Sequence, residues 1–154
     1  MGKLSKEQIQ TYFDEHLPYR NRILIAHKEI CKKGSYHGDI ALLQACFEAS
    51  LITGRMYLNV LGLTKNKNDE IINNNFRHDD VSVNDLGGEL VEINNLKPKE
   101  KQLLLGFLKM VDKGAAHLTL PMKHQWEKTH EAIDFILDLL QKHLYDKVNK
   151  KIKF

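Results

Sequence analysis

The segment between Asp39 and Gly62 constrains the fold most, because it is apolar on nearly every side of a helical wheel. Asp39 is a typical N-cap residue and Gly62 a typical C-terminal cap, so one long helix is predicted from Ile40 to about Leu61. The segment still carries too many polar side chains for a membrane span, namely Gln44, Glu48, Arg55 and Asn59. We therefore expect this helix to lie at the centre of a helical protein.

Four other segments carry residues that favour helices. The first predicts a short helix that ends near His16, because Pro18 follows. The second predicts a helix from about Tyr19 to a C-terminal cap at Gly34. The last two are separated by Pro121 and are expected from Pro98 to about His117, and from about Gln125 or Thr129 to Tyr145.

Residues 79–95 change from helical spacing to strand-like spacing. The runs at 81–83 and 90–93 flank Gly87 and Gly88, and a Gly-Gly pair is suited to a tight turn. This pattern predicts a small β-hairpin, or a pair of extended arms around the Gly-Gly turn, inserted between the third and fourth main helices. The fold expected from the whole chain is all-α: an antiparallel four- to five-helix bundle with this hairpin insertion.

Composition indicates a single domain over residues 1–154. The chain is 42% hydrophobic, with 23 Lys and Arg against 20 Asp and Glu. A formal net charge of +3 is too small to indicate a nucleic-acid partner by itself, and the Lys-rich tail at 146–154 is expected to be solvated. Cys31 and Cys46 form no paired motif, and the N-terminus has no apolar signal segment. We therefore expect a cytoplasmic protein without membrane contact.

The second expected helix places an arginine and a histidine on one side. Arg20 and His27 are seven residues apart and nearly eclipsed at about 100° per residue, whereas Arg22 diverges from His27 by about 140°. The side that holds Arg20 and His27 also carries apolar residues, so both are expected to point inward. A cation held there needs a carboxylate, a second subunit or a polar cleft.

The string from Tyr19 to His27, YRNRILIAH, resembles the Arg-Asn…Ala-His segment of the HEPN superfamily (higher eukaryotes and prokaryotes nucleotide-binding domains). The resemblance implies a small, often dimeric helical bundle in which an Arg and a His, four to six residues apart, cleave RNA without metal. Arg20, Asn21 and His27 match those positions, and Arg22 with His27 is the alternative pair. In many members the motif lies in a later helix, which is a departure here.

The resemblance implies a specific chemistry for these three residues. His27 would be the general acid or base for attack of a ribose 2'-hydroxyl on the adjacent phosphate. Arg20 would hold that phosphate and stabilise its developing charge. Asn21 would orient one of the two. The alternative is structural: Arg20 and His27 form hydrogen bonds with acidic neighbours in the bundle, or the first helix covers them.

Glu48 and Arg55 are candidate binding residues on the central helix. They are seven apart and share a face, so each could reach the same interior groove as the second helix. Glu48 is a candidate partner for Arg20 or His27. The alternative is an internal ion pair between Glu48 and Arg55 without a functional role.

We expect no metal and no cofactor. His117, His124 and His130 are spaced seven and six apart around a proline, which matches no metal-ligand pattern, and the glycines lack the following residues of a phosphate loop. The predicted function is therefore metal-independent RNA cleavage by a HEPN-like domain, with RNA and a second copy of the chain as partners. The alternative is a non-catalytic module that binds a protein or a nucleotide.

Overall fold

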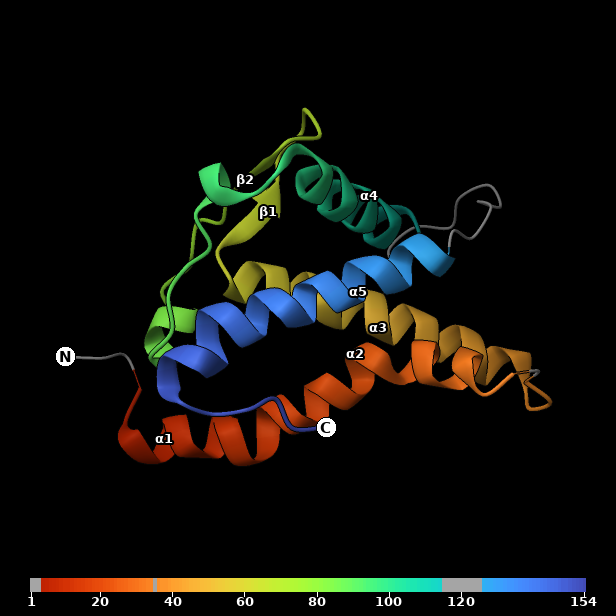
Figure 1. Cartoon of the computed structure of the whole chain (residues 1–154), viewed down its shortest axis with the longest axis horizontal. Coiled ribbons are helices and arrows are strands. Elements are labelled where there is room, and N and C mark those ends of the chain that lie inside the picture. Colours follow the sequence, from red (N-terminus) through yellow and green to blue (C-terminus); the bar gives the residue numbers. More distant parts are fainter. Residues whose placement is uncertain (1–3, 35, 115–125) are drawn as a thin grey trace.

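The computed structural model describes residues 4–34, 36–114 and 126–154, and most of them are helical. The longer helices are accompanied by one small two-stranded antiparallel sheet (Figure 1). The expectation of a mainly helical chain is thus confirmed. No helix in the described part of the chain is both long enough and apolar enough to cross a bilayer.

The first two helices run into each other without a break. α1 (Lys6–Thr11) continues through a π-helical turn at Tyr12–His16 into α2 (Leu17–Lys32). The expected stop before Pro18 is therefore wrong. Within the turn, the Leu17 N–H donates to the Tyr12 carbonyl five residues earlier, and this wider turn makes room for a proline that lacks its own N–H.

α3 (Ile40–Val60) is the central helix, as expected. Asp39 caps its first turn by accepting a hydrogen bond of 2.8 Å from the Ala41 N–H, and Gly62 follows its end with a left-handed φ of 89°. The helix packs against α2, α4 and α5 (Figure 1). Its largest fully buried side chains are Leu51, Tyr57 and Leu58.

The two-stranded sheet follows α3 directly. β1 (Leu63–Lys65) pairs with β2 (Ile71–Asn73), with Leu63 opposite Asn73. The hairpin expected at residues 79–95 is wrong, because short 3₁₀ turns occupy 83–86 and 93–95 instead.

Backbone hydrogen bonds explain why residues 79–95 form no hairpin. The Glu89 N–H donates to the His143 carbonyl, and the Val91 N–H donates to the Leu61 carbonyl. Ser82 and Asp85 cap each other's backbone groups around the 83–86 turn. The second arm therefore bonds to two distant helix ends and the first arm is capped locally, so the two arms do not pair with each other.

The last two helices are α4 (Pro98–Gly114) and α5 (Trp126–Leu140), and they pack against each other and against α3. α5 continues through a π-helical turn at 141–145 and a 3₁₀ turn at 146–148. The expected end of the fourth helix near His117 and the break at Pro121 lie outside the described residues. Beyond the last turn, the C-terminal segment runs back along α1 and α2 (Figure 1).

Candidate functional site

The buried face of α2 includes Asn21 rather than Arg20, its neighbour by one position. Asn21 is fully buried, whereas Arg20 is exposed and its neighbour Tyr19 is 63% exposed. The expectation that Arg20 points into the apolar interior is therefore wrong. His27 is buried, as expected, with only 1% of its surface exposed. Arg20 and His27 thus face different surroundings.

Asn21 satisfies its whole side-chain amide within the fold. Its Nδ2 donates to the Tyr145 hydroxyl at 3.1 Å and to the Lys153 carbonyl at 2.8 Å, and its Oδ1 accepts from the Tyr57 hydroxyl at 2.6 Å. Burial is the main cause that raises the pKa of the Tyr57 hydroxyl, so this donor stays protonated. With its amide groups engaged, Asn21 connects α2, α3 and the C-terminal segment and has little capacity left to orient a ligand.

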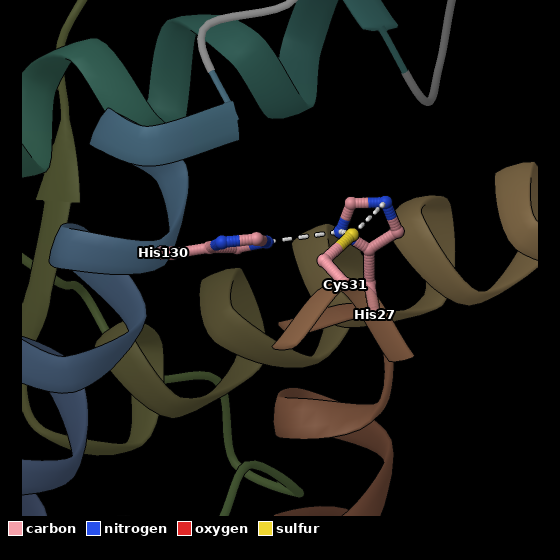
Figure 2. A group of neighbouring side chains, drawn as sticks. All are labelled: His27, Cys31 and His130. Atoms are coloured by element: carbon pink, nitrogen blue, oxygen red, sulfur yellow. Dashed lines mark hydrogen bonds between the residues drawn. The ribbon is translucent and has the colours of Figure 1, made fainter. Parts of the chain in front are cut away.

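His27 belongs to a cluster with Cys31 and His130, which we call the His–Cys–His cluster (Figure 2). His27 Nδ1 lies 3.0 Å from His130 Nε2, and Cys31 Sγ lies 3.6 Å from His27 Nε2 and 3.9 Å from its Nδ1. One donor atom from each of the three residues lies within 4.8 Å of the other two. Phe47 and Trp126 pack edge-on against the His27 ring, with centroid distances of 4.9 and 5.1 Å.

The surroundings of His130 and Cys31 favour the uncharged form of each side chain. Burial is the main cause that lowers the pKa of His130, and the nearby Lys28, which is paired with Asp134, lowers it further. Burial also raises the pKa of the Cys31 thiol, so this cysteine is protonated at neutral pH. Without a bound ion, Cys31 is therefore a poor nucleophile.

Arg20 lines a cavity of about 710 Å³ between α2, α3 and the segment 74–81, which we call the arginine cavity. Arg55 and Arg77 line the same space. Across residues 4–34, 36–114 and 126–154, neither the Arg20 nor the Arg77 guanidinium has an ion-pair partner. A cavity of this size is in the range of small-molecule sites.

Further groups in the arginine cavity are polar or aromatic. Asn59 also lines the cavity, and its buried Oδ1 has no hydrogen-bond partner among the described residues. Asp79 and Asp80 contribute carboxylates, and the aromatic lining includes Tyr12 and Phe76.

The two candidate binding residues on α3, Glu48 and Arg55, have different surroundings, and only Arg55 lines the arginine cavity. Arg55 lines the arginine cavity but donates to Asp112 at 2.7 Å, whereas Glu48 accepts from Gln44 at 3.1 Å and does not line the cavity. Neither expectation for Glu48 holds, because the described part of the chain shows no ion pair from it to Arg20, His27 or Arg55. Of the five predicted site residues, only Arg20 and Arg55 therefore meet in one place.

Most residues of the His–Cys–His cluster and of the arginine cavity were not predicted from the sequence. The spacing of His27 and Cys31, one helical turn apart, was a usable signal for a pair of metal ligands, but the third member is 103 positions away. Arg77 lies in a polar loop without any motif. Of the three histidines that were considered and set aside as metal ligands, His117 and His124 lie outside the described residues.

Comparisons with protein-family models, with curated proteins and with solved structures find no match to this chain. The HEPN resemblance therefore rests on residues 19–27 and on the mainly helical fold, and it stays a prediction.

Proposed function

We propose that this protein binds a small phosphate-bearing ligand of nucleotide size in the arginine cavity. The observation that carries the proposal is the pair of guanidinium groups, Arg20 and Arg77, that line one cavity without ion-pair partners among the described residues. A guanidinium presents several N–H donors in a planar fork that matches phosphate oxygens, so two of them favour an anionic group with several acceptors.

The rest of the lining favours a nucleoside phosphate over inorganic phosphate. Asp79 offers acceptors to ribose hydroxyls, the role that a carboxylate has in dinucleotide-binding folds, whereas the Asp80 carboxylate accepts a hydrogen bond of 2.7 Å from the Arg77 backbone N–H. Tyr12 and Phe76 offer rings that a base can stack on.

This function agrees with the nucleotide-binding alternative and with the name of the superfamily that residues 19–27 resemble. We propose in addition that the helices form the bundle of that superfamily, supported by the packing of α2, α4 and α5 around α3. RNA cleavage by Arg20 and His27, and a dimer that would bring in a second copy of each, remain predictions. The arginine cavity supplies Arg20 without His27 and so gives cleavage no support.

Calorimetric titration with inorganic phosphate, adenosine, AMP and ATP tests the proposal. We expect AMP or ATP to bind, adenosine to bind much more weakly, and Arg20→Ala and Arg77→Ala each to weaken nucleotide binding by about 10-fold or more, the loss of a charged hydrogen bond. Arg22→Ala is the matched control, because Arg22 is an exposed arginine on α2 that does not line the cavity. Absence of nucleotide binding, or equal loss in Arg22→Ala, contradicts the proposal.

The RNA-cleavage prediction has its own experiment. A mixed RNA pool is incubated in EDTA with the wild type, Arg20→Ala and His27→Ala, after each has been shown to be folded. Cleavage that disappears in both variants supports a HEPN-like ribonuclease, whereas an intact pool with the folded wild type contradicts it.

A further inference from the structure

The His–Cys–His cluster has the donor set of a transition-metal site. Imidazole nitrogen and thiolate sulfur are the ligands that Zn²⁺ and similar borderline-soft ions prefer in proteins. His27 and Cys31 lie one turn apart on α2, and α5 brings His130 to the same point (Figure 2). We propose that His27, Cys31 and His130 bind one transition-metal ion of the Zn²⁺ class.

The distances between donor atoms fit such an ion. With Zn–N bonds of about 2.0–2.1 Å and Zn–S bonds of about 2.3 Å, a tetrahedral site has N···N edges of about 3.3 Å and N···S edges of about 3.6 Å. The cluster has 3.0 Å between His27 Nδ1 and His130 Nε2, and 3.9 Å between His27 Nδ1 and Cys31 Sγ. The third edge, between Cys31 Sγ and the His130 donor, is within 4.8 Å, so side-chain movements of up to about an ångström bring all three donors to bonding distance.

Binding replaces bonds that the cluster makes without metal. In the hydrogen bond between the two imidazoles, one ring donates a proton to the other. On binding, His27 Nδ1 and His130 Nε2 each give a lone pair to the ion, so the proton of that hydrogen bond moves to another ring nitrogen. The Cys31 thiol releases its proton to solvent as the sulfur–metal bond forms.

The surroundings of the cluster favour one fixed ligand geometry. The Phe47 and Trp126 rings pack edge-on against His27, which restricts its rotation and excludes water from that side. His27 is buried, while Cys31 and His130 are only partly buried, so an ion can enter past these two residues. Three protein ligands leave a fourth coordination position for water or another donor, as in open zinc sites.

This site is separate from the arginine cavity, because none of its three residues lines that cavity. It also differs from the histidine group considered from the sequence, of which it contains only His130. The two proposals therefore succeed or fail independently of each other.

Titration of the full chain with Co²⁺ is the direct test, because Co²⁺ occupies zinc sites and has visible spectra. We expect one ion per chain, an intense thiolate-to-cobalt charge-transfer band, the strong visible bands of tetrahedral cobalt, and loss of both on adding Zn²⁺. Cys31→Ser should abolish the charge-transfer band. His130→Gln should weaken binding by about 100-fold or more, because loss of a direct ligand costs at least as much as loss of a residue that only orients a ligand, which costs about 10–100-fold.

Cys46→Ser is the matched control, since Cys46 is the other free cysteine, is also partly buried and lies outside the cluster. This variant should keep the full cobalt spectrum. Zn²⁺ should also raise the thermal unfolding temperature of the wild type and of Cys46→Ser, but not of Cys31→Ser, whose fold is verified by circular dichroism in EDTA. Absence of a charge-transfer band in the folded wild type, or its persistence in Cys31→Ser, overturns the proposal.

Discussion

The Asn21 side chain donates a hydrogen bond of 2.8 Å to the backbone carbonyl of Lys153, 132 positions later in the chain. The same amide bonds the Tyr57 and Tyr145 hydroxyls, so three separate segments meet at one buried group. Asn21 was expected to assist catalysis, and it has instead the contacts of a residue that joins the C-terminal segment to the helices. Replacement of Asn21 should therefore change the stability of the fold.

Replacing Asn21 with Ala should destabilise the fold. The substitution leaves the buried Tyr57 and Tyr145 hydroxyls each without one of their partners, and we expect the free energy of unfolding to fall by about 2–4 kcal/mol. Urea denaturation followed by circular dichroism measures the change. Arg22→Ala, one position along on the exposed side of α2, should stay within about 0.5 kcal/mol of the wild type. A similar small effect from Asn21→Ala would show that the amide network contributes little.

Deleting residues 150–154 should also destabilise the fold, although these residues were expected to be solvated. Lys150 Nζ lies 5.1 Å from the centre of the Phe13 ring, Ile152 packs against the core, and Lys153 accepts from Asn21 through its backbone. Because that bond uses the main chain, Lys153→Ala should be close to neutral while the deletion lowers the midpoint of urea denaturation. Equal midpoints for the deletion and the wild type would contradict this assignment.

Local signals predicted the helix ends well. Asp39 and Gly62 bound the central helix as their cap chemistry indicates, and Gly34 follows α2 with a left-handed φ of 93°. These signals succeed because a cap depends on residues within one turn of it. Pro18 shows the limit of such rules, since a wider π turn accommodates it without ending the helix.

Long-range contacts decided what the sequence could not. Arg20 and Asn21 are neighbours on a helical wheel, so the sequence of α2 alone does not show which of them is buried. Asn21 is the buried one because its amide forms hydrogen bonds with the Tyr57 and Tyr145 hydroxyls. The segment 79–95 does not form the predicted hairpin, because the Leu61 and His143 carbonyls accept hydrogen bonds from its backbone N–H groups. The His–Cys–His cluster likewise depends on how α5 docks on α2. None of these partners is near in sequence.

Two glycines give opposite predictions for the same substitution. A Cβ on Gly88 would lie 2.4 Å from the His143 backbone oxygen, which cannot move aside, so Gly88→Ala should cost about 1–3 kcal/mol of stability. A Cβ on Gly106 would meet nothing within 4 Å inside α4, so Gly106→Ala should add about 0.5–1 kcal/mol. Thermal and urea denaturation of both variants checks the pair. A stabilised Gly88→Ala would mean that the contact between 88 and 143 is misplaced.

His143 should make the fold less stable as the pH falls below neutrality. Burial is the main cause that lowers the pKa of His143 from its usual 6.5; the hydrogen bond to the Glu89 carbonyl is the next-largest effect and opposes it, and Lys142 and Lys147 lower the pKa by smaller amounts. The unfolded chain therefore binds a proton at a higher pH than the folded chain does. The resulting loss of stability begins as the pH drops through about 6.5 and is complete below the pKa in the folded state.

The variant His143→Gln isolates this effect, because an amide can still donate to the Glu89 carbonyl but does not titrate. Unfolding free energies measured at pH 7.5 and at pH 5.5 should differ less in His143→Gln than in the wild type. Arg22→Gln, an exposed substitution that also removes a positive charge site, should keep the wild-type difference. If His143→Gln retains the full wild-type difference, protonation of other groups accounts for the acid sensitivity, and the ring at 143 titrates alike in the folded and unfolded chain.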